Sequence, residues 1–372
     1  MRIGFDAKRA FANKTGLGNY SRFVLEALTT FQPEHDYLAY TPKNRQNLFP
    51  AFPESAIHFP ESFLDKKLSP YWRYSSITNQ LKKDHIEVFH GLSNEIPQRL
   101  QKVGIRSVVT IHDLIFERLP HLFKSIDRMI YRHKFKSACE RADVVIAISE
   151  QTKRDLIELY DIERSKIQVI YQDCNPVFKE KKSQYETDQI LSLYDIQEPY
   201  ILSVGTLEER KNQHRLVEAF AALKNREFNL LLIGKPTPYI QTIKDCIARF
   251  GLEKQVKLLH NAPTEHLPAL YQRAEIFAYI SIYEGFGIPV LEALHSGTPV
   301  LAARGSCLEE AGGPGGLYAD PYQTKDISHQ LKTLMNDAFL RKSLIVAGQE
   351  HIAQFTGEHI ARQLADIYKS LT

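Results

Sequence analysis

The sequence is poor in cysteine and contains no long apolar segment. Its four cysteines, Cys139, Cys174, Cys246 and Cys307, lie far apart and show no C-x-x-C spacing. We therefore expect neither a zinc scaffold nor a disulfide scaffold, and a reducing cytosol suits this pattern. No run approaches the roughly 18 uninterrupted apolar residues of a membrane-spanning helix. The opening residues, Met1 to Asp6, turn charged too early for a signal peptide. These features predict a cytoplasmic protein.

An excess of charge of one sign is also missing. The net charge is +3 over 372 residues. Residues 1–180 hold 27 Lys and Arg against 22 Asp and Glu, or +5, and the remainder holds 20 against 22, or −2. Such a mild asymmetry does not predict nucleic-acid binding. The length is that of about two ordinary domains.

Three common nucleotide-site motifs are absent. No expected strand is followed by G-x-G-x-x-G and a later acidic residue, which argues against a nicotinamide-dependent dehydrogenase. The P-loop pattern G-x-x-x-x-G-K-[ST] is missing, which argues against a P-loop kinase. No Asp-x-Asp pair stands ready to hold Mg²⁺ under a diphosphate. We therefore expect no metal and no other cofactor.

The most informative stretch lies between residues 275 and 297. Glu275 to Ile280 is an apolar run rich in strand formers, which predicts a buried strand. The decapeptide Y-E-G-F-G-I-P-V-L-E, from Tyr283 to Glu292, follows it. Pro289 stands where a helix would begin and Gly297 where it would end. The pattern predicts a strand, a glycine loop and a helix.

Such a turn suits a phosphorylated ligand. Gly285 and Gly287 let the backbone approach a ligand closely, and N–H groups at the start of a helix favour an anion. Glu292 near the first helical turn and Glu284 in the loop could accept hydrogen bonds from hydroxyl groups. A nucleotide sugar has phosphates in the middle and hydroxyls at both ends. The same turn occurs in any doubly wound protein, however, and either glutamate could be a solvated surface charge.

The two glutamates eight residues apart, around G-F-G and followed by Ala293 to Val300, resemble a known signature. It is that of the retaining GT-B glycosyltransferases of the glycosyltransferase family 4 (group 1) type. The resemblance spans most of the chain and is strongest from 200 to 321. It implies an α/β fold of two Rossmann-like doubly wound domains that face a central cleft. It also implies donor binding by Gly285, Phe286, Gly287 and Ile288, with Glu292 on the ribose and Glu284 at the transferred sugar.

A second motif follows the apolar run from Tyr200 to Val204. The segment Gly205-Thr206-Leu207-Glu208-Glu209-Arg210-Lys211-Asn212 is similar to the family's G-T-L-E-x-R-K-N. Arg offers a planar fork for phosphate oxygens and Lys a mobile point charge. By resemblance, Arg210 and Lys211 form the main diphosphate clamp. Gly205 and Thr206 belong to the donor site, and the role of Thr206 stays open. Without the resemblance, adjacent cations are more often simply solvated.

Three further donor contacts rest on the same resemblance. Gly16 and Gly18 would form a glycine loop that faces the donor diphosphate. His112, at the end of an expected strand from Arg106 to Ile111, would contact the donor sugar. A lone histidine at a strand end is otherwise more often structural. Asn261, in the turn after an expected strand from Val256 to Leu259, would lie near the nucleobase and contact it through its backbone.

The alternation of strands and helices predicts two α/β domains with parallel sheets. We expect an acceptor-side Rossmann-like domain over residues 1–178 and a nucleotide-sugar-binding one over 199–350. A linker is expected over 179–197, and a helix over 351–372 crosses back to the first domain. Where many relatives carry Asn-Gly, this chain has Gln172-Asp173-Cys174-Asn175-Pro176, so the match is loose there.

The segment from His121 to Arg141 predicts an amphipathic helix. Its apolar residues recur at helical spacing: Leu122, Phe123, Ile126, Met129, Ile130 and Phe135. Its cations are Lys124, Arg128, Arg132, Lys134 and Lys136. The favoured interpretation is a solvated basic face. The alternative is peripheral docking on anionic lipid at the inner face of a membrane, where a lipid-linked acceptor would lie.

Together these features predict a retaining glycosyltransferase. It would move a sugar from a nucleoside diphosphate sugar to a hydroxyl of a glycan or lipid-linked acceptor, plausibly in surface-polysaccharide assembly. The G-T-L-E-x-R-K-N branch favours mannose and GDP-mannose. The alternatives are transfer from UDP-glucose or another UDP-sugar, and a non-catalytic module that only binds a nucleotide sugar.

Overall fold

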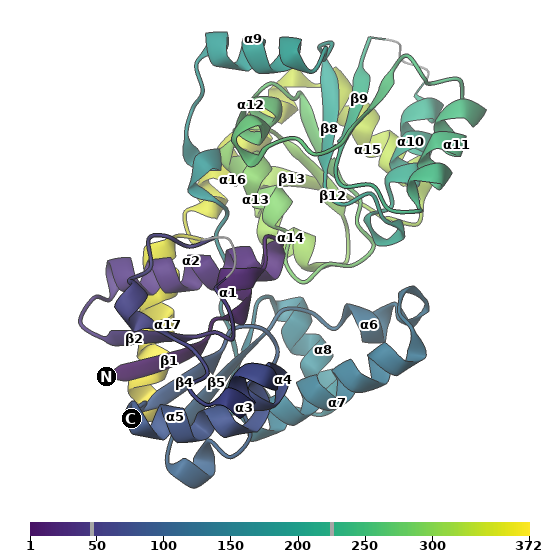
Figure 1. The fold of residues 1–372 in the computed structure, drawn as a ribbon. Coiled ribbons are helices and arrows are strands. Elements are labelled where there is room, and N and C mark those ends of the chain that lie inside the picture. The colour runs from purple at the N-terminus through teal and green to yellow at the C-terminus, as the bar shows by residue number, and fades with distance from the viewer. Residues whose placement is uncertain (45–47, 224–226) are drawn as a thin grey trace. The chain divides into compact units, whose positions relative to one another are not determined.

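A computed structural model describes residues 1–44, 48–223 and 227–372 and divides the chain into two compact units. The first unit comprises Met1–Gln172 together with Phe355–Thr372, and the second comprises Asp173–Gln354. Each unit contains one parallel sheet with helices packed against it (Figure 1). The α/β class expected from the sequence is therefore confirmed.

The first unit is built on a seven-stranded sheet in the order β3-β2-β1-β4-β5-β6-β7. Its strands pair parallel and in register, for example Ile3 with Tyr37 on one side and Val88 on the other. The strands are β1 (Arg2–Asp6), β2 (Asp36–Tyr40), β3 (Ile57–His58), β4 (Val88–Gly91), β5 (Arg106–Ile111), β6 (Val144–Ala147) and β7 (Ile167–Val169). The strand order reverses between β1 and β4, which is where ligands bind in open α/β sheets.

Helices cover both faces of this first sheet. They are α1 (Lys8–Ala12), α2 (Gly16–Phe31), α3 (Phe63–Lys67), α4 (Ser69–Tyr71), α5 (Ile77–Lys83), α6 (Ile115–Arg118), α7 (Ser125–Arg141), α8 (Glu150–Tyr160) and α17 (Gly357–Leu371). The last helix, α17, packs along α2, although more than 300 residues separate them (Figure 1). Its Tyr368 hydroxyl lies 2.7 Å from Nδ1 of the buried His90 in β4. The end of the chain is therefore part of the first unit's core.

The second unit is built on a six-stranded parallel sheet in the order β10-β9-β8-β11-β12-β13. The strands are β8 (Tyr200–Val204), β9 (Asn229–Ile233), β10 (Val256–Leu259), β11 (Ile276–Tyr279), β12 (Val300–Ala303) and β13 (Gly316–Ala319). All residues of β11 and β12 are buried. Continuous apolar strands of this kind are typical of parallel sheets covered on both faces. The strand order reverses between β8 and β11.

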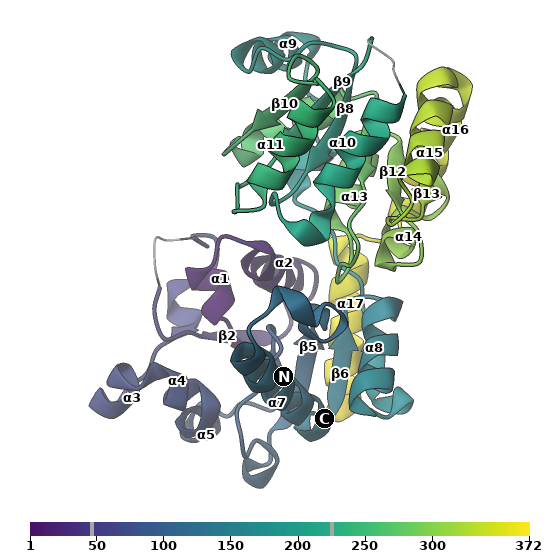
Figure 2. The same cartoon turned by 90° about the vertical axis from the view of Figure 1, so that its right-hand side faces the viewer.

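The helices of the second unit lie in two groups on either side of its sheet (Figures 1 and 2). One group contains α10 (Gln213–Ala222), α11 (Ile240–Arg249) and α15 (Thr324–Asn336). The other contains α9 (Gln184–Leu193), α12 (Leu267–Gln272), α13 (Ile288–His295) and α16 (Ala338–Ile352), and α14 (Cys307–Gly312) follows β12. The carboxyl ends of β8 and β11 stay free of covering helices, so their following turns can carry a site.

Several boundaries differ from those expected from the sequence. The division between units falls after Gln172, not after residue 178. The segment 179–197, expected to be a linker, contains α9 and belongs to the second unit. A capping box signals this helix, because Ser183 accepts from the backbone N–H of Glu186 and the Glu186 carboxylate accepts in return. The helix α8 is capped by Ser149, whose hydroxyl accepts from the N–H of Thr152.

The helix expected over 121–141 begins at Ser125, and only part of its apolar stripe packs. Phe135 packs against Phe116 with ring centroids 5.3 Å apart, and Ala138 and Cys139 are buried. Ile126, Met129 and Ile130, nearer its start, are 55%, 61% and 43% exposed. Periodicity identifies a face of a helix, but it does not identify what covers that face. Among the described residues, no helix is long and apolar enough to cross a bilayer.

Candidate active site

The candidate site lies on the second unit, at the reversal point of its sheet. The turn after β8 runs from Gly205 to Asn212, and the loop after β11 runs from Ile280 to Gly287. The two strands are direct neighbours. The N–H of Ile282 donates to the carbonyl oxygen of Arg210 at 2.8 Å, which ties the two turns together. The structure thus brings the two predicted motifs, about 75 residues apart in sequence, to one place.

Gly205 and Gly287 both have a positive φ, +152° and +153°, which other residues rarely adopt. A Cβ on Gly287 would also lie 2.9 Å from Cδ2 of Leu308 in α14, which is closer than real Cβ atoms come. A Cβ on Gly205 would meet its nearest atom, in the Tyr279 ring, at an ordinary 3.6 Å. Backbone conformation therefore explains Gly205, and backbone conformation together with packing explains Gly287.

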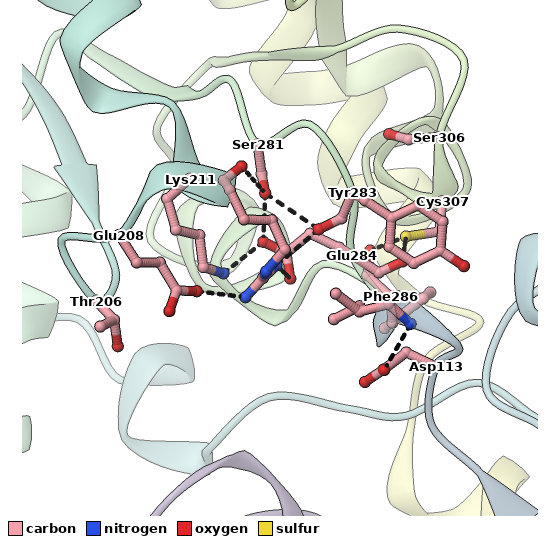
Figure 3. A network of polar contacts seen from close by, with 12 residues as sticks. Asp113, Thr206, Glu208, Lys211, Ser281, Tyr283, Glu284, Phe286, Ser306 and Cys307 are labelled. Carbon is pink, nitrogen blue, oxygen red and sulfur yellow. Dashed lines mark hydrogen bonds and ion pairs between the residues drawn. The ribbon is translucent and has the colours of Figure 1, made fainter. Parts of the chain in front are cut away.

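The carboxylate of Glu284 is the centre of a polar network (Figure 3). Its Oε2 accepts from Nη1 of Arg210 at 2.7 Å. Its Oε1 accepts from Oγ of Ser281 at 2.7 Å and from the hydroxyl of Tyr279 at 3.0 Å. Lys211 Nζ forms an ion pair with the same Oε1 and lies 4.8 Å from the centre of the Tyr279 ring. Both carboxylate oxygens are therefore fully engaged.

Burial and charge act in opposite directions on this network. Burial alone would raise the pKa of Glu284, but Lys211 and Arg210 outweigh it and hold that pKa at about 2. Burial lowers the pKa of Lys211, and the carboxylate of Glu284 limits the shift. Burial also opposes the charge of Arg210, but Glu284 and Glu208 outweigh it and raise that pKa above its usual range. Glu284 is consequently ionised at neutral pH and holds two cations beside it.

Arg210 is fixed on every side. Its Nη1 also donates to the carbonyl oxygen of Tyr283 at 2.6 Å, and its Nη2 donates to Oε1 of Glu208 at 2.6 Å. At the end of the same turn, Asn212 has φ +61° and donates its side-chain N–H to the carbonyl oxygen of Pro321 at 2.7 Å. The two cations therefore project from a turn that is anchored at both ends.

Tyr279, Ser281 and Glu208 were not predicted from the sequence as site residues. Tyr279 ends β11 and Ser281 follows two residues later. Residues two apart in an extended segment share a face, so one side of this segment is polar where its neighbours are apolar. The sequence contains this pattern, but polar residues at a strand end are so common that no functional role can be assigned to them without the fold.

Glu292 lies in α13, and the hydroxyl of Tyr271 donates to its Oε2 at 2.9 Å. Burial raises the pKa of Glu292 to about 7, and the hydrogen bond from Tyr271 lowers it by a smaller amount. Tyr271 itself is buried, and Thr298 donates to its carbonyl oxygen at 2.6 Å. Glu292 is thus a weakly satisfied acceptor, in contrast to Glu284.

The loop between the two glutamates is held by Cys307 of α14. Its thiol donates to the carbonyl oxygens of Phe286 at 2.7 Å and Glu284 at 3.1 Å. Phe286 is buried, and α13 begins immediately after Gly287, at Ile288. The loop is therefore a rigid support for the start of α13. Gly285 is buried in the same loop.

Two other predicted donor residues also lie on the second unit. Thr206 stands in the turn after β8, where its carbonyl oxygen accepts from Nε2 of Gln213 at 3.0 Å. Asn261 follows β10, is exposed and has φ +60°. Neither side chain joins the Glu284 network. Their assignment as donor contacts stays a prediction.

Gly16, Gly18 and His112 lie on the first unit. The glycines are in the first turn of α2 rather than in a loop before it. A Cβ on Gly18 would lie 1.9 Å from the carbonyl oxygen of Asn13, so this residue is glycine because the chain passes too close for any other. Nothing lies within 4 Å of a Cβ on Gly16. Close packing therefore requires glycine at position 18, and the donor contacts predicted for Gly16 and Gly18 stay predictions.

His112 follows β5 and is buried. Its Nε2 donates to the carbonyl oxygen of Leu92 at 2.9 Å, and its ring meets the edge of Tyr20 with centroids 4.6 Å apart. Burial lowers the pKa of His112 to about 4, while the bond to Leu92 opposes the shift. The imidazole is therefore neutral and fixed in one tautomer at neutral pH.

The chain matches two sequence families that describe its two halves. The family described as Glycosyltransferase Family 4 matches residues 16–172, and the family described as Glycosyl transferases group 1 matches residues 189–351. The O-antigen chain mannosyltransferase B of Escherichia coli is 30% identical over 295 residues, which cover 78% of this chain and 75% of that protein. The O-antigen chain mannosyltransferase RfbU of Salmonella typhimurium is 28% identical over 258 residues, covering 68% and 69%.

Solved structures share the fold at lower identity. HepE of Anabaena, solved in complex with UDP, has a TM-score of 0.78 at 18% identity and covers the whole of both chains. WaaG, a glycosyltransferase involved in lipopolysaccharide biosynthesis, has a TM-score of 0.70 at 18% identity and covers 99% of each chain. Fold and site thus define a glycosyltransferase with two Rossmann-like units. The chain belongs to the group 1, family 4 glycosyltransferases of the GT-B fold.

Glu292 predicts a specific dependence of stability on pH. The pKa of Glu292 is raised from 4.5 to about 7 in the folded protein. The folded state therefore holds this proton more tightly than the unfolded chain does, and the resulting stabilisation is complete below pH 4.5. This stabilisation is lost as the pH rises from 4.5 through about 7. Glu292→Gln should remove this loss. Relative to the wild type, we expect this variant to gain on the order of 1–3 kcal/mol in free energy of unfolding between pH 5 and 8.

The measurement is chemical denaturation of both proteins across that pH range. Glu350→Gln, which changes an exposed glutamate on α16, serves as the matched control and should show no such trend. A difference between wild type and Glu292→Gln that stays constant with pH would contradict the raised pKa.

Proposed function

We propose that the enzyme transfers a sugar from a nucleoside diphosphate sugar to a hydroxyl of a glycan or lipid-linked acceptor, with retention of anomeric configuration. The single observation that carries this proposal is the convergence of Arg210, Lys211 and Glu284 at the reversal point of the second sheet. That is where open α/β sheets bind nucleotides. The relatives named as O-antigen mannosyltransferases support a role in surface-polysaccharide assembly and favour mannose as the sugar.

The diphosphate is the leaving group, so negative charge grows on its oxygens as the glycosidic bond breaks. Arg210 and Lys211 are 14% and 11% exposed at their side chains, and water therefore screens them poorly. Glu284 is a well-buried anion beside them, and Glu208, which is 34% exposed, pairs with Arg210 at 2.6 Å. Water screens the more exposed Glu208 more strongly, so the two cations keep an attraction for a diphosphate and are fixed in place before the reaction begins.

The two glutamates do not suit a double displacement through a glycosyl-enzyme intermediate. A nucleophilic carboxylate needs a free oxygen, as in retaining glycosidases. Both oxygens of Glu284 are occupied by cations and hydroxyls. We assign Glu292 to the ribose of the donor. Transfer on one face fits better: the bond from C1 to the phosphate oxygen breaks, the bond from C1 to the acceptor oxygen forms, and the acceptor's proton passes to the departing phosphate.

On this proposal the remaining residues have separate roles. The donor is held mainly by the second unit, with Gly205, Thr206, Gly285, Gly287 and Asn261 around it. The first unit binds the acceptor, and its Gly16 and neutral His112 contact the donor's phosphate and sugar. No metal is needed under the diphosphate, because two fixed cations already neutralise it.

Removal of either cation should lower turnover. We expect Arg210→Ala and Lys211→Ala each to reduce kcat by a factor on the order of 10²–10³, as for loss of one preorganised electrostatic donor. The measurement is transfer from the sugar donor under saturating conditions, with the fraction of folded protein checked by circular dichroism. Wild-type activity in EDTA, measured in parallel, should be retained.

Exposed cations of the same unit provide matched controls. Arg249→Ala and Lys254→Ala change side chains far out in solvent and should leave kcat near the wild-type value. Near-normal turnover in both Arg210→Ala and Lys211→Ala would contradict the clamp. Loss of activity in EDTA, restored by magnesium, would contradict the metal-independent reaction.

The donor can be identified by ligand-induced stabilisation, because a compound that binds only the folded protein raises its melting temperature. We expect GDP-mannose to give the largest shift in a panel of GDP- and UDP-sugars. At about 100 times its dissociation constant, a ligand stabilises by about 2.7 kcal/mol. The specific alternative is a UDP-sugar, which the UDP-glucose complex of HepE favours.

The panel separates these outcomes. A shift with UDP-sugars alone would replace the mannosyl assignment by transfer from a UDP-sugar. No shift with any nucleotide sugar would contradict the donor site itself. Glu292→Gln should reduce the shift of the best donor while keeping the fold, since it weakens the proposed ribose contact.

We also propose that α7 brings the first unit to an anionic membrane surface. Ile126, Met129 and Ile130 are exposed near its start, beside the cations Lys124 and Arg128. Apolar side chains flanked by cations suit the boundary between headgroups and acyl chains of anionic lipid. A lipid-linked acceptor would be met at that surface.

Vesicle sedimentation tests this surface. The wild type should sediment with vesicles that contain anionic lipid, less so at high salt, and not with neutral vesicles. The double variant Ile126→Ser with Met129→Ser should lose this binding. Phe339→Ser, which changes an 83% exposed residue of α16, should retain it. Absence of salt-sensitive binding by the wild type would remove the proposal.

A further inference from the structure

Three potential metal ligands of different chemistry meet in the second unit, apart from the Glu284 network. Asp173 and Cys174 begin this unit, and His295 is the last residue of α13. One carboxylate oxygen, Sγ and a ring nitrogen from these residues all lie within 4.8 Å of one another. Neither the family resemblance nor the proposed transfer reaction uses these side chains.

The histidine of this cluster has an unused ring nitrogen. Nε2 of His295 is buried and has no hydrogen-bond partner among the described residues. Its nearest charged neighbour is Oδ1 of Asp173 at 3.7 Å, which is too long for a hydrogen bond. A buried polar atom left unpaired costs free energy, so it calls for an explanation. A ligand atom placed between these groups would supply the missing partner.

The carboxylate of Asp173 is already oriented. Its Oδ2 pairs with Nζ of Lys179, and its Oδ1 accepts from the backbone N–H of Cys174 at 2.8 Å. Oδ1 is also the atom that faces His295. Lys179 therefore holds Oδ2 of Asp173, while Oδ1 points towards the ring of His295. An arrangement in which outer partners fix the orientation of a ligand is usual around protein-bound metals.

We propose that Asp173, Cys174 and His295 bind one zinc ion, with water as a fourth ligand. With bonds of about 2.0–2.3 Å, a tetrahedral site places its ligand atoms about 3.3–3.7 Å apart. The separation of 3.7 Å between His295 and Asp173 fits this range, and a spread of up to 4.8 Å needs only small side-chain movements. A sulfur, an imidazole and a carboxylate together favour zinc over magnesium or calcium, which take oxygen ligands.

Binding changes the charge of the cluster by one unit. The thiol of Cys174 gives up its proton to solvent, because a coordinating thiol is bound as the thiolate. The thiolate and the carboxylate of Asp173 offset the two charges of the ion, the imidazole binds in its neutral form, and the ion-paired Lys179 keeps its charge. Asp173 and Cys174 are both buried, which keeps competing water from most of the site. The ion needs no residue of the Glu284 network.

The site lies one helical turn from a residue of the proposed donor site. His295 and Glu292 are three residues apart on α13, and residues at this spacing share a helix face. Burial raises the pKa of the Cys174 thiol, and the charges of Asp173 and Glu292 raise it further. Zinc would therefore sit beside the ribose contact and act as a structural or modulating ion. It would not lie under the diphosphate, so its binding can be tested without any donor or acceptor.

Cobalt(II) reports on such a site directly. The full chain is stripped of metal with EDTA, dialysed and titrated with cobalt(II) chloride. We expect one cobalt per chain, with the visible bands of tetrahedral cobalt and a near-ultraviolet band for charge transfer from thiolate to metal. Addition of one equivalent of zinc should abolish both signals. Metal analysis should then find one zinc per chain.

Variants identify the ligands. Cys174→Ser should lose the charge-transfer band, and His295→Ala should weaken zinc binding at least tenfold. Cys246→Ser and His329→Ala change a cysteine of α11 and an exposed histidine of α15, and both should behave as the wild type. Absence of a thiolate band in the wild type would overturn the proposal, even if the variants failed to fold. So would a band that persists in folded Cys174→Ser.

Discussion

The ion pairs between Glu284, Arg210 and Lys211 are the interaction on which the rest of the site depends. Removal of one partner from a buried ion pair typically costs 3–5 kcal/mol, because a charge is left without compensation. Here the partners come from the turns after β8 and β11, so the pairs also fix the distance between those turns. The order of strands in the second sheet makes β8 and β11 neighbours. Topology therefore positions the charges, and the charges in turn hold the two turns in one conformation.

Part of this site could be predicted from the sequence. The spacing of Glu284, the glycines and Glu292 indicated a turn between a strand and a helix, and the cations after Gly205 indicated a second one. Their meeting followed only from the family resemblance, because spacing does not show which strands are neighbours. The resemblance, the fold class and the enzyme class are confirmed. Ser281 and Tyr279 were missed, since a polar residue near a strand end gains meaning only when a carboxylate is placed beside it. The residue roles in the reaction stay predictions.

The outline of the fold was predicted better than its boundaries. Apolar runs located the strands, and Pro289 and Gly297 marked the two ends of α13 to within two residues. The capping box of Ser183 and Glu186 would have located α9 in the same way, but that segment was assigned to a linker. For α7, helical periodicity located the helix but did not show that Ile126, Met129 and Ile130 would be exposed. The spacing of Gly16 and Gly18 also did not show that the carbonyl of Asn13 leaves no room for a side chain at Gly18, whose predicted phosphate contact stays a prediction. For α9, α7 and Gly18, the missing information was the identity of the neighbouring segment.

The return of α17 to the first unit has a consequence for the order in which the protein forms on the ribosome. Domains generally fold as units during synthesis, the N-terminal one first. Here the first unit lacks α17, and with it one of the two side-chain partners of His90, until the whole second unit has been synthesised. The second unit, by contrast, is complete at Gln354. The nascent chain can therefore complete its second unit first, while the face of α2 that α17 covers is still exposed.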